Sequence, residues 1–215
     1  MITLDVISDP ICPWCYIGKT QLDRALAARP DHPFDVFWRP YQLNPDMPRE
    51  GMDRRAYLSA KFGGDEKAAE VYAAVEAAAA EAGLKIDFSK IDRTPNTLDA
   101  HRLIRWARVE EVQGKVVDEL FRRNFEDGED ISDPAVLCAA AAAAEMDADL
   151  VATLLASDAD LQEVRDEDAQ AREIGVRRVP TFIVNEQYAL QGAQPPEIWA
   201  KAIEELSGPA PAGTA

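Results

Sequence analysis

Cysteine and histidine are scarce in this chain of 215 residues, which contains three cysteines and two histidines. Three cysteines cannot all pair and are too few for a disulfide scaffold, so the fold must rest on a buried core, and the chain is long enough to form one. Long apolar runs are also missing, because charged residues interrupt each of them. We therefore expect no membrane-spanning helix and no membrane partner.

Positive charge is in short supply, since 23 Lys and Arg against 39 Asp and Glu give a formal net charge of -16. Such a charge repels phosphate backbones, so we expect no nucleic-acid partner. A secretory signal is missing as well, because Met1 leads directly into the alternating run ITLDVIS. This favours a cytoplasmic location, where a Cys pair is more often catalytic or metal-binding than a stable disulfide, although a mature chain whose signal had been removed would look the same.

Three regions differ in their hydrophobic period. Residues 1–47 show a strand, a helix from Trp14 to Arg29 and a second strand, which predicts a βαβ unit with parallel strands. Residues 48–175 are almost entirely helical in pattern and rich in Ala, Glu and Leu. Residues 176–206 return to period two in RRVPTFIVN and YALQG, then end in a helix, PPEIWAKAIEEL. Residues 207–215, SGPAPAGTA, are expected to be a disordered tail.

Capping residues indicate where helices of the middle region begin and end. We expect one helix after Thr97 that Gly114 terminates, and another that opens at Asp133-Pro134 and continues to Glu145. Two further helices are predicted over 150–157 and 160–174, and Gly175 ends the second.

Two cysteines lie together in SDPICPWCYIGK, at the junction of the first strand and the first helix. Cys12 would face free backbone N–H groups and the positive end of the helix dipole, which favour a thiolate. Cys15 shares a helical stripe with Leu22 and Leu26 and should face the interior. One exposed and one buried thiol suit thiol-disulfide exchange, in which Cys12 attacks and Cys15 resolves the mixed disulfide.

A zinc site and a static disulfide are the two alternatives for this pair. Zinc needs four ligands, and the remaining candidates, Cys138, His32 and His101, are isolated in the sequence, so we expect no metal. Cys138 is expected to be a buried structural thiol. A disulfide within one helical turn would constrain very little chain.

A proline opens the late strand in VRRVPTFIVN, where the missing N–H would remove a ladder hydrogen bond from an interior strand. By itself, Pro180 fits either a strand-initiating proline or a special backbone position such as a cis bond between Val179 and Pro180.

Together these features resemble the thioredoxin superfamily and, within it, the DsbA-like branch that carries a helical insertion. DPICPWCYIGK, RPYQLNPDMPREG, PNTLDAHRLIRWA and VRRVPTFIVNEQYALQGAQPPE are similar to FrnE-type members, which are close to 2-hydroxychromene-2-carboxylate isomerases and kappa-class glutathione transferases. The resemblance implies an α/β, thioredoxin-like fold (βαβ…ββα) with a large all-helical insertion. It also implies a thiol-disulfide oxidoreductase of the protein disulfide reductase or isomerase type, with no cofactor besides the redox-active disulfide and with glutathione as a candidate co-substrate.

The resemblance also assigns roles to individual residues. Cys12 would be the nucleophile and Cys15 the resolving cysteine, while Pro180 would be a cis-proline facing them. Val179 would offer its backbone to an extended peptide or to glutathione. The remaining candidates complete the motif or line the substrate groove: Pro13, Trp14, Asn96, Gly192, Ala193 and Gln194.

Two other functions stay open. A glutathione-dependent isomerase or transferase would use the same groove without redox turnover, but relatives of that kind typically lack the Cys pair that this chain retains. A chaperone-like module would bind peptides through its helices. We expect peptide, small thiol or disulfide partners, and a homodimer is compatible with the sequence. Because no cation or histidine lies between the cysteines and Asp9 is acidic, we expect a moderate or reducing potential.

Overall fold

The structure is a computed structural model that describes residues 1–207. Of the predicted tail over 207–215, only Ser207 is described, and it is the last residue of the final helix, so the boundary of that helix is one residue later than expected. Within residues 1–207, no helix combines the length and apolar content needed to cross a membrane.

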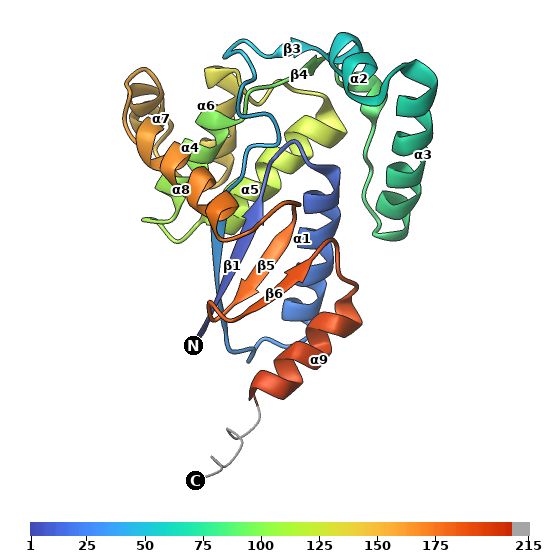
Figure 1. Ribbon diagram of the computed structural model, residues 1–215. Coiled ribbons are helices and arrows are strands. Elements are labelled where there is room, and N and C mark those ends of the chain that lie inside the picture. The colour runs from blue at the N-terminus through green and yellow to red at the C-terminus, as the bar shows by residue number, and fades with distance from the viewer. Residues whose placement is uncertain (208–215) are drawn as a thin grey trace.

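A four-stranded mixed sheet lies at the centre of the half formed by residues 1–47 and 176–207 (Figure 1). In the order in which they pair, its strands are β2 (Phe34–Pro40), β1 (Ile2–Ser8), β5 (Thr181–Val184) and β6 (Tyr188–Gln191). The first two are parallel and are joined by helix α1 (Pro13–Ala27), while β5 is antiparallel to both of its neighbours. This arrangement confirms the predicted βαβ unit and the predicted hairpin.

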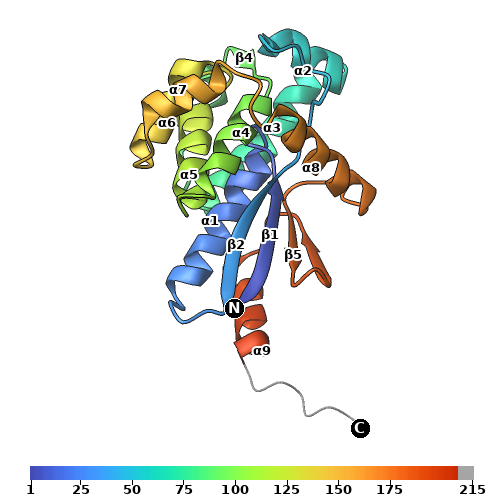
Figure 2. The ribbon, with the colours of Figure 1, turned by 90° about the vertical axis from the view of Figure 1, so that its left-hand side faces the viewer.

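Strand residues alternate between two covered faces of this sheet. Leu4 and Phe182 are buried against α1 and α9 (Pro196–Ser207), and the Phe182 ring meets the ring of Trp199 edge to face at 4.7 Å. Ile7 and Ile183 face the opposite side, where they pack near Ala171 of α8 (Leu161–Glu173). Helices α1 and α8 therefore cover opposite faces, as Figure 2 shows.

The insertion, residues 48–175, is helical as expected, with one departure. Its α-helices, besides α8, are α2 (Arg54–Phe62), α3 (Asp65–Glu81), α4 (Leu98–Ala107), α5 (Gln113–Arg122), α6 (Pro134–Ala143) and α7 (Ala148–Leu155). A 3-10 turn at Phe88–Lys90 and a π-helical turn at Arg123–Asp127 connect them. The departure from an all-helical insertion is a two-residue antiparallel pair, β3 (Met52–Asp53) and β4 (Arg93–Thr94), too short to produce a periodic pattern.

The helix predicted from Thr97 to Gly114 is two helices. It ends at Ala107, because Glu111 takes a left-handed conformation and the Val112 N–H returns to the Ala107 carbonyl. Gly114 is therefore the second residue of α5 and terminates nothing. The predicted N-cap at Asp133 is confirmed, since its carboxylate accepts a hydrogen bond from the Ala135 N–H.

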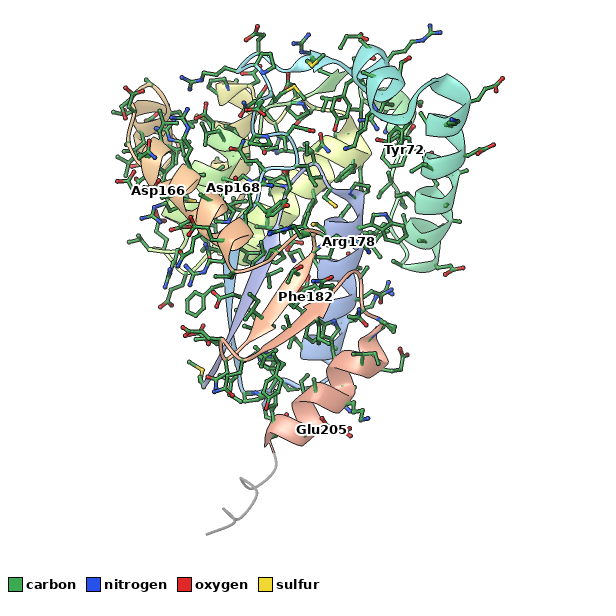
Figure 3. All side chains as sticks on the ribbon, in the orientation of Figure 1. Tyr72, Asp166, Asp168, Arg178, Phe182 and Glu205 are labelled. Carbon is green, nitrogen blue, oxygen red and sulfur yellow. The ribbon has the colours of Figure 1, made fainter. Side chains whose placement is uncertain are left out.

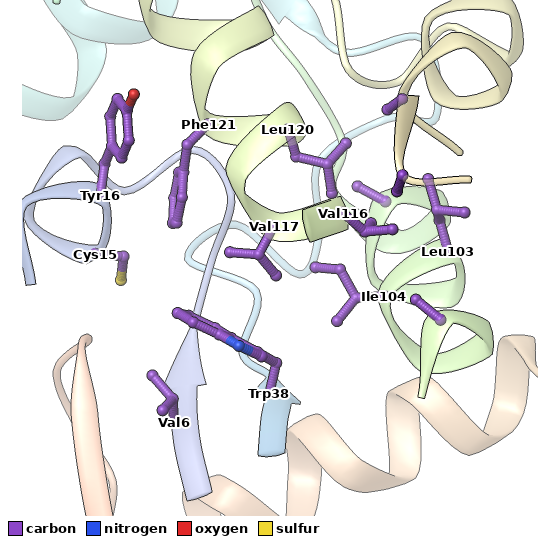
Figure 4. Close-up of a cluster of buried hydrophobic side chains, with 14 of the residues drawn as sticks. Val6, Cys15, Tyr16, Trp38, Leu103, Ile104, Val116, Val117, Leu120 and Phe121 are labelled. Carbon is purple, nitrogen blue, oxygen red and sulfur yellow. The ribbon is translucent and has the colours of Figure 1, made fainter. Parts of the chain in front are cut away.

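The most extensive apolar cluster among the described residues joins the sheet half to the insertion. Figure 4 shows Cys15 and Trp38 of the sheet half beside Ile104, Val117 and Phe121 of the insertion. All five are buried. The insertion is therefore fastened to the sheet half through shared core, and α1 sits at that boundary.

Candidate active site

The Cys pair lies where the loop after β1 enters α1. Cys12 is the residue preceding the helix, in an extended conformation, and its N–H donates to the Asp9 carbonyl at 2.9 Å. Pro13 occupies the first helical position, where a missing N–H is tolerated. The Cys15 N–H donates to the Cys12 carbonyl at 2.9 Å, which places Cys15 one turn deeper. Both cysteines are free thiols, so the structure describes the dithiol form.

Both thiols are buried, which corrects the expectation that Cys12 is exposed. Cys12 is 5% exposed and Cys15 is 1% exposed, whereas Trp14 between them is 40% exposed. A segment distant in sequence contributes to the cover over Cys12. The Cys12 thiol donates a hydrogen bond to the carbonyl of Val179 in that segment, at 3.7 Å. Helix position alone gives Cys12 an outward direction but does not show this cover.

Pro180 faces the Cys motif and is held from two sides. The peptide bond from Val179 to Pro180 is cis. On one side lies Gly18 of α1, where an added Cβ would come within 2.9 Å of the Pro180 Cγ. On the other side the Gly192 N–H donates to the Pro180 carbonyl at 2.8 Å. The close approach of α1 to this proline therefore depends on glycine at position 18.

A cavity of about 370 Å³ opens beside Cys12, between the sheet half and the insertion. The Cys motif contributes Cys12, Pro13 and Trp14 to its lining, and the segment before β5 contributes Val179. The opposite side is largely aromatic, from Tyr57 and Phe62 of α2 and Tyr72 of α3. The cavity thus brings residues of the Cys motif, the segment before β5 and the insertion onto one lining.

The other predicted groove residues lie near this cavity but do not line it. Asn96 is tied into the backbone, since its side chain donates to the Met47 carbonyl at 2.6 Å and accepts from the Leu98 N–H at 2.9 Å. It borders a neighbouring hollow together with Asp168. The loop of Gly192, Ala193 and Gln194 supports Pro180 from behind, and the Gln194 side chain donates back to the Gln191 carbonyl.

Sequence reasoning missed the cations of the cavity. Arg54 and Lys61 of α2 line it, and so do Arg177 and Arg178. The doublet Arg177-Arg178 stands directly before Val179-Pro180, so its proximity to the motif was a signal in the sequence. The contribution of α2 had no such signal, because nothing local indicates which helix of the insertion faces the Cys pair.

Burial dominates the electrostatics around Cys15. Desolvation raises its pKa well above the ordinary value, and a hydrogen bond with Cys12 and the charge of Cys12 raise it further. A hydrogen bond donated by the main chain of Asp9 lowers this pKa and the Asp9 carboxylate raises it, so the predicted opposition of Asp9 to a thiolate acts on Cys15. The Cys15 thiol is therefore held in its protonated form in the dithiol state.

Asp9 and His101 form a buried polar pair behind the motif. Complete burial raises the pKa of Asp9 to about 7, against the effect of hydrogen bonds from the Leu43 and Ile11 N–H groups. Burial lowers the pKa of His101 to about 4. The His101 Nε2 lies 3.8 Å from the Asp9 Oδ1 and has no hydrogen-bond partner in the described chain.

Cys138 takes no part in this site. It lies on α6 and is partly rather than fully buried, which corrects the expectation of a buried thiol. Among residues 1–207, no three His, Cys, Asp or Glu side chains gather in a way that could hold a metal ion.

Three solved structures of low sequence identity share the fold. The cytosolic disulfide reductase DsbM from Pseudomonas aeruginosa is 17% identical with a TM-score of 0.70, over 95% of this chain and 98% of that one. A structure of the same protein with GSH is 16% identical to this chain, with a TM-score of 0.70. A 2-hydroxychromene-2-carboxylate isomerase is 15% identical with a TM-score of 0.69, over 95% of this chain and 96% of that one.

Two stronger likenesses carry the assignment. The probable DsbA oxidoreductase SCO1869 from Streptomyces coelicolor is 31% identical with a TM-score of 0.86, over 100% of this chain and 94% of that one. The model of the DSBA-like thioredoxin domain matches residues 3–204. With its Cys pair at the junction of β1 and α1, the chain therefore belongs to the DsbA-like thioredoxin-domain family of thiol-disulfide oxidoreductases.

Proposed function

We propose that this protein is a cytoplasmic disulfide reductase or isomerase that uses Cys12 as its nucleophile and Cys15 as its resolving cysteine. The observation that carries the proposal is the placement of the Cys12 thiol, 3.7 Å from the Val179 carbonyl, in the lining of a cavity. A substrate disulfide entering that cavity meets the thiol and the main chain beside Pro180 together.

The reducing reaction takes two exchanges. The Cys12 thiolate attacks one sulfur of the substrate disulfide, a new S–S bond forms, and the other substrate sulfur leaves as a thiolate. The Cys15 thiolate then attacks the Cys12 sulfur and releases the second substrate thiol. Two electrons pass from the dithiol to the substrate, and the Cys12–Cys15 disulfide remains. An isomerase cycle differs in its last step, because another substrate thiolate releases Cys12.

A reducing direction is consistent with the groups around the pair. Strong oxidants need a dithiol form that nearby charge stabilises. The motif has Pro13 and Trp14 between its cysteines, and neither supplies a positive charge. We expect a reduction potential nearer the value of about -270 mV for thioredoxin than the value of about -120 mV for DsbA.

Within the family we propose placement with the FrnE-type members, on the motifs DPICPWCYIGK and VRRVPTFIVNEQYALQG. A glutathione-dependent isomerase or transferase is the second candidate. The size of the cavity favours it, since about 370 Å³ suits a small ligand. The shared fold with a 2-hydroxychromene-2-carboxylate isomerase also makes it a reasonable alternative.

The test is trapping of the mixed disulfide by a Cys15→Ala variant, together with insulin reduction by the unmodified protein. We expect Cys15→Ala to accumulate a covalent adduct on Cys12, and Cys12→Ser to abolish insulin reduction. A Cys12→Ser variant that retains a glutathione-dependent activity would instead establish the second candidate. Failure of Cys12 to form a mixed disulfide with any disulfide substrate would overturn both the reductase and the isomerase role.

A further inference from the structure

The cavity beside Cys12 is positively charged, although the chain has a net charge of -16. Arg54 and Lys61 line it on the insertion side, and Arg177 and Arg178 line it on the sheet side. No Asp or Glu is among the described residues that line it. In a chain with far more acidic than basic residues, such a lining sets this surface apart from the rest of the molecule.

No described Asp or Glu side chain neutralises these four cations. Among the described side chains none of the four forms an ion pair, whereas Lys19 is paired with both Asp23 and Asp118. The Arg54 guanidinium lies 5.0 Å from the centre of the Tyr72 ring. The Lys61 ammonium donates to the Tyr57 hydroxyl at 2.7 Å. Aromatic rings and a hydroxyl thus hold the two α2 cations in place and leave their charge available to a ligand.

The cations lie on both sides of the reacting sulfur. Arg178 adjoins Val179, whose carbonyl accepts from the Cys12 thiol, so a group next to the reacting sulfur on that side lies near Arg178. Two of the residues that line the cavity are labelled in Figure 3, Tyr72 on α3 and Arg178 on the segment that enters β5. A ligand that spans the cavity therefore meets positive charge at each end.

We propose that this site selects small disulfides that carry a carboxylate on each side of the S–S bond, with Arg178 and Lys61 as specificity-determining residues. The inference rests on the proposed exchange reaction and adds a charge preference to it. The chemistry is unchanged: Cys12 bonds to one sulfur, the other leaves as a carboxylate-bearing thiolate, and Cys15 completes the transfer of two electrons.

A small ligand fits better than an acidic protein for two reasons. Cys12 is only 5% exposed and is reached through a cavity of about 370 Å³, near the lower end of small-ligand sites at about 300–1,000 Å³. In addition, the net charge of -16 repels another acidic macromolecule as a whole, while a dicarboxylate carries few charges and feels mainly the nearby cations.

The test uses three small symmetrical disulfides of similar size: 3,3′-dithiodipropionate, which is dianionic, 2-hydroxyethyl disulfide, which is neutral, and cystamine, which is dicationic. The rate at which each forms a mixed disulfide with full-length Cys15→Ala is measured by mass spectrometry and divided by its rate with free N-acetylcysteine. We expect the dianion to react first and the dication last. The net charge of the protein alone would produce the opposite order.

Charge-removing variants assign the preference to residues. Arg178→Gln and Lys61→Gln, each combined with Cys15→Ala, should lower the ratio of the dianion rate to the neutral-disulfide rate by about threefold to tenfold, as expected for one nearby charge in partly solvated surroundings. Lys201→Gln on α9 makes the same charge change away from the cavity, and we expect it to change neither rate. Raising the salt concentration should reduce the difference in normalised rate between the dianion and the dication.

Each outcome separates the two proposals. Equal normalised rates for the three disulfides, or cystamine reacting first, would overturn the charge preference and leave the exchange reaction standing. No reaction with any of them would overturn the exchange reaction and the preference together. An acidic peptide disulfide that reacted much faster than 3,3′-dithiodipropionate would replace the small ligand with an acidic polypeptide.

Discussion

Gly18 leaves the space that Pro180 occupies beside the Cys motif. An alanine Cβ there would come within 2.9 Å of the Pro180 Cγ, closer than real Cβ contacts. We expect Gly18→Ala to displace Pro180 and to lower insulin reduction about tenfold, because misplacement of a substrate-positioning group by about 1 Å costs up to a hundredfold in rate. Activity is measured beside the thermal unfolding temperature.

Gly114 provides the matched control, because a Cβ at this α5 position meets nothing within 4 Å. Gly114→Ala should leave activity unchanged and increase the free energy of unfolding by up to about 1 kcal/mol through helix propensity. Equal activity of the two alanine variants would show that Pro180 does not depend on Gly18.

Asp9 and His101 make opposite contributions to the pH dependence of stability. The pKa of Asp9 in the folded protein, about 7, is above its ordinary value of 3.8, so its contribution is complete below pH 3.8 and is lost as the pH rises through 7. The pKa of His101 in the folded protein, about 4, is below 6.5, so its contribution is complete above pH 6.5 and is lost as the pH falls through 4.

Replacing Asp9 should therefore flatten the decline in stability that its titration causes between about pH 3.8 and pH 7. As the pH rises from 5 to 8, the unmodified protein should lose roughly 3 kcal/mol of unfolding free energy that Asp9→Asn does not lose, as an order of magnitude for a buried carboxyl. Urea denaturation at several pH values measures it. Parallel profiles for the two proteins would mean that Asp9 titrates normally when folded.

At the residue scale, the sequence predicts the reacting groups better than it predicts their surroundings. Cys12, Cys15 and Pro180 are recognisable because their spacing and neighbours are local in the chain. The burial of Cys12 and the cations of α2 were missed, because both depend on segments that only the tertiary fold brings to the motif.

Among the elements, α2 is the least anchored side of the cavity. None of its residues is buried, although Asp53 caps its N-terminus. Helix α5, by contrast, buries Val116, Val117, Leu120 and Phe121. We expect amide hydrogens of α2 to exchange much faster than those of α5, because local opening of α2 exposes little apolar surface. Hydrogen exchange read by mass spectrometry tests this, and equal protection would contradict it.

A ligand in the cavity should reduce the difference in amide hydrogen exchange between α2 and α5. A ligand that touches Tyr57, Lys61 and Phe62 adds contacts that α2 lacks in the free protein. Protection of α2 should therefore rise in the trapped adduct of Cys15→Ala, while protection of α5 stays the same.

Element types were largely predictable and element ends were less so. The alternation in ITLDVIS and the turn after Asn185 identify β1 and the hairpin, because strand period and turn chemistry are local properties. Gly114 misled the prediction of the helix after Thr97, because apolar spacing continued through the turn over 108–112.

Across the whole molecule, the shared core makes the sheet half and the insertion depend on each other. The Tyr16 ring stacks on Phe121 with centroids 5.0 Å apart, and Phe121 is fully buried. We expect Phe121→Ala to lower the free energy of unfolding by about 3–5 kcal/mol. Because the two parts share this cluster, circular dichroism and tryptophan fluorescence should follow one coincident transition.

An exposed apolar residue gives the comparison for this change. Ile174 is 62% exposed, so Ile174→Ala should alter the free energy of unfolding by no more than about 0.5 kcal/mol. Two separate transitions in either variant would show that the insertion unfolds by itself.

The cover over Cys12 should also prevent disulfide cross-linking between copies of the protein through this residue. We expect that two copies that collide do not bring their Cys12 sulfurs together, because each Cys12 is buried beside its own cavity. The thiol available for accidental cross-linking is instead Cys138, which is partly exposed. Covalent dimers that form in air should therefore be linked through Cys138, and they should retain a working Cys12–Cys15 dithiol.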